Sequence, residues 1–167
     1  MALAKSASHD VIASERQLTD LIRQIQAADR VALDTEADSL HSYREKLCLL
    51  QISVPASVNV HGCQDFILDP LADLDLEPLR QALESREIVL HAADYDLRML
   101  RRGLNFTASR IFDTVIAARL LGIREFSLGA LVKRFFGVEL HKHSQKANWA
   151  LRPLPPRMLK YAVDDVH

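Results

Sequence analysis

The order of the apolar segments constrains the fold of this chain more than any other feature. Strand-like segments lie at 30–36, 46–54, 58–60 with 66–68, 87–91 and 110–113. The first three are joined by short connections, which is typical of antiparallel neighbours, whereas helical segments separate the later ones. This order predicts an α/β fold. The sheet is expected to be mixed and five-stranded, with three antiparallel strands, then two parallel ones, and helices on both faces.

Helix signals lie between and after these strands. Ser14 is a suitable N-cap for a helix that runs to about Ala28, with an apolar stripe along one side. Further helices are expected at 76–85, 93–102, 114–121 and 127–136. A last helix is expected to begin near Pro156, since proline is favourable in a first turn. Residues 138–156 form a polar segment that contains prolines.

Composition indicates one globular domain. The 167 residues are 49% hydrophobic and 26% charged, which suits a single core. We expect an N-terminal arm at 1–13 and a domain at 14–167. The first 100 residues hold nine basic and 17 acidic side chains, and the remainder hold 12 and five. A basic C-terminal half beside an acidic half is compatible with a phosphate-binding surface beside a metal site, and equally with solvated helix faces.

Cysteine usage and hydropathy limit the other classes of protein. Cys48 and Cys63 match no metal-binding or disulfide spacing. The start of the chain has no apolar signal region, and no apolar run reaches membrane-spanning length. We therefore expect a cytoplasmic protein with no membrane partner. The sequence does not indicate an oligomeric state.

Two carboxylates stand at the end of the first strand. Val31, Leu33 and Thr35 form one face of this strand, so Asp34 and Glu36 emerge together on the other. Two carboxylates at this spacing repel each other unless a cation lies between them. Protons, an arginine or a divalent metal ion are all possible.

Two more acidic motifs follow. In His91-Ala92-Ala93-Asp94-Tyr95-Asp96, a strand ends and a helix begins, and ligands of α/β sheets gather at such places. Asp94 is suited to cap the helix, and Asp96 has less reason to do so. On the last helix, Tyr161 and Asp165 share a face, and Asp164 is within reach of it. Spacing alone does not choose between Asp164 and Asp165.

In this order the motifs closely resemble those of the ribonuclease D group of DEDD-type 3′–5′ exonucleases. Asp34-Thr35-Glu36 matches the first motif, His91-x4-Asp96 the second and Tyr161-x3-Asp165 the third. Connecting signatures are also similar, namely Phe112-Asp113-Thr114, Ser127-Leu128, Lys142, Gln145 and Trp149-x2-Arg152-Pro153-Leu154. The resemblance selects Asp96 over Asp94 and Asp165 over Asp164. Tyrosine four residues before the last aspartate marks the tyrosine subclass; the histidine subclass has histidine where this chain has Lys160.

The resemblance implies an RNase H-like fold and a two-metal site. Asp34, Glu36, Asp96 and Asp165 would hold two divalent ions, Mg²⁺ or Mn²⁺, which prefer carboxylate oxygens and suit phosphodiester hydrolysis. Asp34 would bridge both ions, and Glu36 and Asp165 would complete the ion that activates water. Asp96 would hold the ion at the leaving group. Tyr161 would complete the catalytic set by orienting the attacking water.

The expected function is a 3′–5′ exoribonuclease that releases 5′-mononucleotides from RNA 3′ ends, for example in structured RNA or tRNA processing. One alternative is a 3′–5′ DNA exonuclease that acts on single-stranded DNA, of the proofreading or helicase-associated type. Another is a catalytically weak nucleic-acid-binding module. Members of this family commonly continue past the third motif, so the domain is expected to be truncated at its C-terminus.

Substrate-binding residues are expected mainly in the polar segment and in the loop after the first strand. The expected substrate-binding set is Lys142, Gln145, Trp149 and Arg152. Lys146 and Lys160 are further candidates for phosphate contacts, which carry little sequence information. His41, Tyr43 and Trp149 are candidates for stacking on bases, although Trp149 is equally suited to pack beneath the polar segment.

Overall fold

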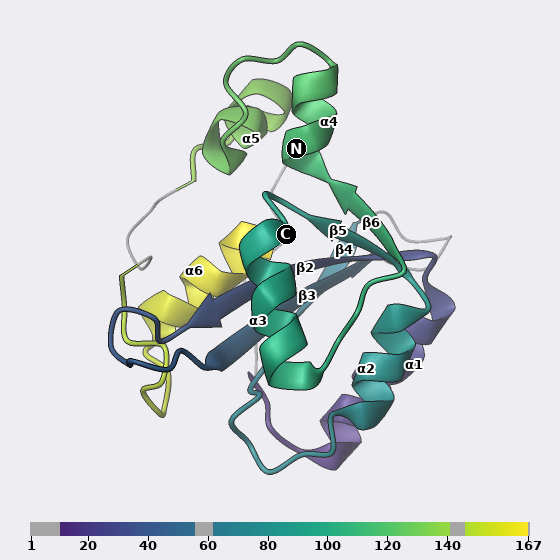
Figure 1. The fold of residues 1–167 in the computed structure, drawn as a ribbon, viewed down its shortest axis with the longest axis vertical. Coiled ribbons are helices and arrows are strands. Elements are labelled where there is room, and N and C mark those ends of the chain that lie inside the picture. The colour runs from purple at the N-terminus through teal and green to yellow at the C-terminus, as the bar shows by residue number, and fades with distance from the viewer. Residues whose placement is uncertain (1–10, 56–61, 141–145, 167) are drawn as a thin grey trace.

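The computed structural model describes residues 11–55, 62–140 and 146–166 and has a six-stranded mixed sheet (Figure 1). Its strands are β1 (Val11–Ile12), β2 (Arg30–Ala37), β3 (Leu47–Pro55), β4 (Cys63–Leu68), β5 (Glu87–Leu90) and β6 (Arg110–Asp113), in the spatial order β1-β4-β3-β2-β5-β6. β3 pairs antiparallel with β2 and β4, and β5 pairs parallel with β2 and β6. The predicted α/β fold with a mixed sheet is confirmed.

The predicted count of five strands is wrong by one. Val11 and Ile12, which were assigned to the N-terminal arm, form β1 and pair in parallel with Ile67 and Leu68 of β4. Two residues are too few to give a period, so only the contact with β4 defines this strand. β4 begins at Cys63, and the predicted part at 58–60 lies outside the described residues.

Within the described residues, six helices accompany the sheet. They are α1 (Glu15–Ala27), α2 (Glu77–Glu84), α3 (Asp94–Leu104), α4 (Thr114–Leu120), α5 (Leu128–Phe136) and α6 (Pro156–Val166). Each lies within two residues of its predicted position, and three of them begin at a side-chain cap. The side chains of Ser14, Asp113 and Ser127 accept backbone N–H groups at the starts of α1, α4 and α5.

Two apolar cores lie on opposite faces of the sheet, as predicted. Leu50 and Ile52 of β3 pack into the core that contains α1, α2 and α3. Cys48 and Leu49 pack into the second core, which contains α6 and the segment around Trp149. α4 and α5 project from the β6 side of the sheet (Figure 1), and no residue of α5 is buried.

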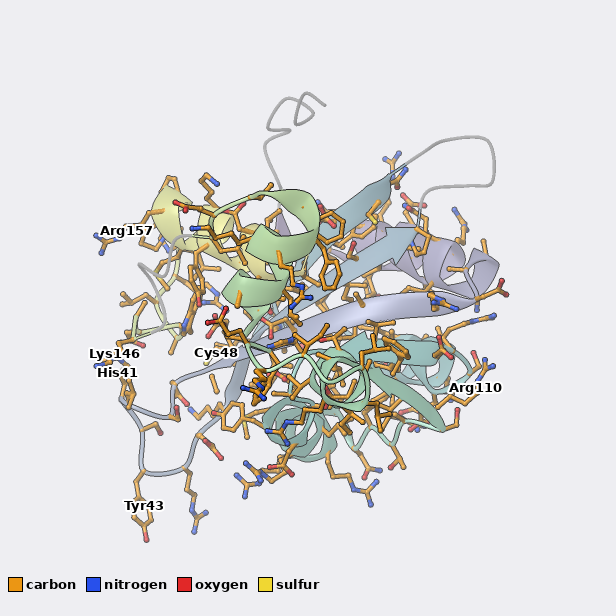
Figure 2. All side chains as sticks on the ribbon, turned by 90° about the horizontal axis from the view of Figure 1, so that it is seen from above. His41, Tyr43, Cys48, Arg110, Lys146 and Arg157 are labelled. Atoms are coloured by element: carbon orange, nitrogen blue, oxygen red, sulfur yellow. The ribbon has the colours of Figure 1, made fainter. Side chains whose placement is uncertain are left out.

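The connection between β2 and β3 lies beside the segment that precedes α6. His41 lies next to Lys146 (Figure 2), and its Nε2 is 3.4 Å from the Lys146 carbonyl oxygen. Among the described residues, every helix is too short or too polar to cross a bilayer.

Candidate active site

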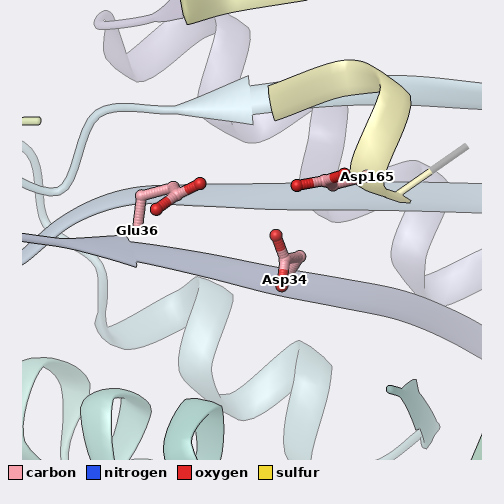
Figure 3. Close-up of side chains that lie close together, drawn as sticks. All are labelled: Asp34, Glu36 and Asp165. Atoms are coloured by element: carbon pink, nitrogen blue, oxygen red, sulfur yellow. The ribbon is translucent and has the colours of Figure 1, made fainter. Parts of the chain in front are cut away.

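Three carboxylates meet between β2 and α6. Val31, Leu33 and Thr35 of β2 are buried on the α3 side, so Asp34 and Glu36 face α6, which supplies Asp165. One carboxylate oxygen from each of the three lies within 4.8 Å of the others. Figure 3 shows the three side chains converging from the strand and the helix. The carboxylates are only partly buried, so the cluster is open to solvent and ligands.

The electrostatics of this cluster show the repulsion that the strand pattern predicts. Burial, then the charges of Asp96 and Asp165, raise the pKa of Asp34 well above its usual range. Burial, then the charges of Asp34, Asp165 and Asp96, raise the pKa of Glu36 to about 9. Each additional negative charge is therefore unfavourable until a cation compensates it. Oxygen donors at this separation and with this charge fit a divalent metal ion such as Mg²⁺.

Asp96 stands beside the cluster but outside its closest group. The Thr35 hydroxyl donates a hydrogen bond of 2.5 Å to Oδ1 of Asp96, which is buried. Burial raises the pKa of Asp96 in spite of this hydrogen bond. Among the described residues, the group within 4.8 Å contains Asp34, Glu36 and Asp165 only. Asp94 is directed to solvent, where it forms an ion pair of 2.5 Å with Arg98.

On α6, as on α3, one of two nearby aspartates lies at the surface and the other lies at or beside the cluster. Asp164 accepts a hydrogen bond of 2.6 Å from Lys160 at the surface, and Asp165 faces the cluster. Tyr161 lies one turn before Asp165 and is 8% exposed. Burial, a hydrogen bond with Asp165 and the neighbouring carboxylates raise the pKa of the Tyr161 phenol. The phenol is therefore protonated at neutral pH and serves as a hydrogen-bond donor.

Gln51 is a site residue that the sequence analysis missed. It pairs with Asp34 across β2 and β3, and its Nε2 donates a hydrogen bond of 3.4 Å to Asp34 Oδ2. The side chain is fully buried, and its Oε1 has no hydrogen-bond partner in the described part of the chain. The available signal was a single amide within the apolar run Leu47–Val54.

Asp113 fixes the start of the helix that carries Asp96. Its carboxylate accepts the backbone N–H groups of Ala92 and Ala93, at 3.2 and 2.9 Å, before α3. It also accepts that of Val115 at the start of α4. Ala92 has φ of 60°, and this left-handed turn brings the end of β5 into α3. Asp113 thus joins two helices, a role that sequence spacing does not reveal.

A cavity of about 230 Å³ opens beside the cluster. Its walls are His91, Ser127, Leu128, Gly129, Leu140, Tyr161 and Asp165. The His91 Nδ1 is 2.8 Å from the hydroxyl oxygen of Thr114, which itself donates to the Leu90 carbonyl at 3.2 Å. His91 is therefore hydrogen-bonded to the structure at the cavity wall.

Trp149 and Arg152 are engaged within the protein. Trp149 is 1% exposed, and its ring centroid lies 6.1 Å from that of Tyr161. All five N–H groups of Arg152 donate to the protein, to both carboxylate oxygens of Asp69 and to three backbone carbonyls. These two residues support the packing of the segment against the sheet.

The other predicted substrate contacts are not located. Lys142 and Gln145 lie outside the described residues. Substrate binding by Lys142, Gln145, Trp149 and Arg152 stays a prediction. To bind substrate, Arg152 would have to give up one of its hydrogen bonds to the protein.

Comparisons with known proteins agree with this arrangement. A family model described as 3′-5′ exonuclease matches residues 10–167. Exosome complex component 10 of Rattus norvegicus is 36% identical over 160 residues, which cover 94% of this chain and 17% of the relative. Ribonuclease D of Zymomonas mobilis is 34% identical over 163 residues, which cover 95% of this chain and 40% of the relative.

A solved structure is also similar to this chain. Escherichia coli RNase D, described as an exoribonuclease involved in structured RNA processing, matches with a TM-score of 0.82 and 28% identity. The match covers 96% of this chain and 42% of that one. The chain thus spans less than half the length of each of these relatives. The resemblance to ribonuclease D is confirmed, and the chain belongs to the 3′-5′ exonuclease family.

Proposed function

We propose that this protein is a metal-dependent 3′–5′ exoribonuclease that removes 5′-mononucleotides from RNA 3′ ends. The observation that carries the proposal is the cluster of Asp34, Glu36 and Asp165 beside the protonated phenol of Tyr161. Family membership supports the reaction, and relatives named ribonuclease D support RNA as the substrate.

The proposed cofactor is a pair of divalent ions, Mg²⁺ or Mn²⁺. Asp34, Glu36 and Asp165 would hold them, with Asp96 as the fourth acidic ligand. The raised pKa values of Asp34 and Glu36 support a need for cations at this place. When bound, such ions supply an activated water and compensate the charge that develops on the phosphoryl oxygens.

The chain's own groups orient the reactants. Because burial keeps the Tyr161 phenol protonated, it cannot act as a base, and we assign it the orientation of the attacking water by hydrogen bonding. The Thr35 hydroxyl holds Asp96, and the Gln51 amide holds Asp34, so both carboxylates have fixed directions. Fixed ligands lower the reorganisation needed during the reaction.

The proposed substrates are the 3′ ends of structured RNA, including tRNA. The description of Escherichia coli RNase D as an enzyme of structured RNA processing supports this choice. A cytoplasmic location is part of the same proposal, and cell fractionation tests it.

The proposal is tested with one RNA labelled at either its 3′ or its 5′ end. We expect mononucleotide release from the 3′ label at once and a shortening ladder from the 5′ label, with Mg²⁺ or Mn²⁺ and not with chelator. Asp34→Asn should abolish both signals, because it removes a ligand from the cluster. A DNA of the same sequence is the comparison, and faster digestion of the DNA would overturn RNA as the substrate. Activity in chelator would overturn the metal requirement.

A further inference from the structure

The loop at residues 38–46, which joins β2 to β3, is anchored at its base. Asp38 is buried, and its Oδ1 accepts the backbone N–H of Lys46 at 2.7 Å. The Asp38 carbonyl accepts the N–H groups of His41 at 2.7 Å and Ser42 at 2.9 Å. These bonds join the two ends of the loop, so its tip stands on an ordered base directly after Glu36.

The loop is also attached to α3. Glu45 accepts a hydrogen bond of 3.1 Å from the Tyr95 hydroxyl and forms an ion pair with Arg102. Both partners belong to α3, the helix that carries Asp96. The loop is therefore fixed to the element that contributes to the acidic cluster.

Tyr43 stands at the tip of this anchored loop. Its exposed fraction is 103%, so it contributes nothing to the core. Figure 2 shows the side chain pointing away from the sheet. A hollow of about 580 Å³ lies between the loop and α3, and its lining is Ser39, Ser42, Tyr43, Arg44, Glu45 and Arg102. The Tyr43 ring is therefore free to contact a ligand that enters the hollow.

The chemistry of the lining matches a nucleotide chain. The Tyr43 ring offers a face for stacking on a base, which is independent of sequence. The guanidinium of Arg44 is exposed and suits a phosphate. The neighbouring α3 surface adds the exposed guanidinium group of Arg101, and those of Arg98 and Arg102, which form ion pairs with Asp94 and Glu45. Cations outnumber anions on this surface, which favours a polyanion over an acidic or neutral peptide.

We propose that this hollow binds single-stranded RNA upstream of the 3′ end that enters the acidic cluster. The inference rests on the proposed function and extends it with a second binding place for the same substrate. Tyr43 follows Glu36 by seven residues, so the two are at most about 25 Å apart. RNA of several nucleotides is long enough to occupy both places.

Binding and digestion of RNA of different lengths test the inference. Anisotropy in chelator measures binding of RNA of about 12 nucleotides, a length within the usual range for such sites, without hydrolysis. Tyr43→Ala should weaken this binding at least about fivefold, the lower end of the effect of one base stacked on an aromatic ring. Tyr43→Trp should bind this RNA about as tightly as the wild type, because it keeps an aromatic ring at the position. Arg44→Ala should weaken binding and reduce the salt slope by about one.

A matched control and a second readout separate the outcomes. Arg23→Ala removes an exposed guanidinium from α1, away from the loop, and should leave binding unchanged. In metal-supported digestion, Tyr43→Ala should raise KM more for the longer RNA than for a dinucleotide. The inference is overturned if Tyr43→Ala binds RNA as tightly as the wild type, or if its KM rises equally for both RNA lengths. If the wild type shortens no RNA while Tyr43→Ala still loses binding, the proposed function fails, and only RNA binding by the hollow is retained.

Discussion

At the scale of single residues, stability and the proposed catalysis make opposite demands on the acidic cluster. Burial, then the charges of Asp96 and Asp165, raise the pKa of Asp34. Asp34→Asn keeps the shape of the side chain and removes the cost of either ionising this carboxyl beside its neighbours or holding a proton on it. Without metal, we expect Tm to rise by about 2–4 °C, the shift that about 1 kcal/mol produces in a chain of this size. With Mg²⁺, the variant should gain less stability than the wild type and lose at least about 100-fold in activity.

Asp164→Asn is the matched control for this change. Asp164 is adjacent to Asp165 in the chain but pairs with Lys160 at the surface, and such pairs contribute little. Thermal unfolding with chelator and with Mg²⁺ compares the two variants. A lower Tm of Asp34→Asn in chelator would contradict the repulsion between the carboxylates.

A second prediction at this scale concerns Gln51. Its amide donates to Asp34, and its buried Oε1 has no hydrogen-bond partner among the described residues. Gln51→Leu removes both groups at similar volume, so stability should change little or rise. Activity should fall about 10–100-fold, the usual effect of losing a partner of a metal ligand, and more Mg²⁺ should be needed for half-maximal rate. The measurement is a Mg²⁺ titration of activity.

The control for Gln51 is Ser53→Ala, which changes another buried polar residue of β3 that pairs with Asp65 and not with Asp34. Its Mg²⁺ requirement should equal that of the wild type. An unchanged Mg²⁺ requirement in Gln51→Leu would show that the hydrogen bond does not position Asp34.

At the scale of elements, an ion pair between two residues far apart in sequence attaches the segment before α6 to the sheet. Arg152 binds Asp69 through two hydrogen bonds of 2.6 Å and also donates to the Cys48 carbonyl of β3. Burial acts to raise the pKa of Asp69, but hydrogen bonds from Arg152 and from the Leu71 N–H lower it overall. A lowered folded-state pKa means that the stabilisation is present above the unfolded pKa of about 3.9 and is lost as pH falls through the folded value.

Asp69→Asn should therefore lower the free energy of unfolding by about 1–3 kcal/mol at neutral pH. The difference from the wild type should shrink below about pH 4, where the Asp69 carboxyl of the unfolded chain takes up its proton, and continue to shrink toward the lower pKa of the folded protein. Urea unfolding over this pH range measures both effects. Asp20→Asn, which breaks an exposed pair with Arg23, is the control and should change stability by less than about 1 kcal/mol. A difference independent of pH would mean that the charge of Asp69 is not involved.

The same elements show what the sequence allows one to predict. β2 and the caps at Ser14 and Ser127 follow from local patterns, because period and capping act over a few residues. β1 depends on its contact with β4, and Arg152 meets Asp69 across 83 positions in sequence, so neither has a local signal. At the site, spacing left Asp164 and Asp165 equivalent. Only the packing of α6 on the sheet brings Asp165 to Asp34 and Glu36.

At the scale of the whole molecule, the cluster couples folding to protons. The pKa of Glu36 is about 9 in the folded protein because of burial and the charges of Asp34, Asp165 and Asp96. In the unfolded chain the same carboxyl ionises near its ordinary pKa of about 4.3. Since the folded value is the higher one, the contribution to stability is complete below about pH 4. It is lost as pH rises toward 9 in the metal-free protein.

Metal binding reverses this trend, which gives the last prediction. Metal ligands must lose their protons before they bind. For each proton that the metal displaces, the apparent affinity rises about tenfold for every unit by which the pH increases. The rise of Tm produced by a fixed Mg²⁺ concentration should therefore be larger at about pH 8.5 than at about pH 6.5, while Tm in chelator falls over the same interval. Glu36→Gln carries no such proton and should flatten the decline in chelator. A Mg²⁺-induced shift that is equal at both pH values would mean that the carboxyls that bind metal are already ionised in the metal-free fold.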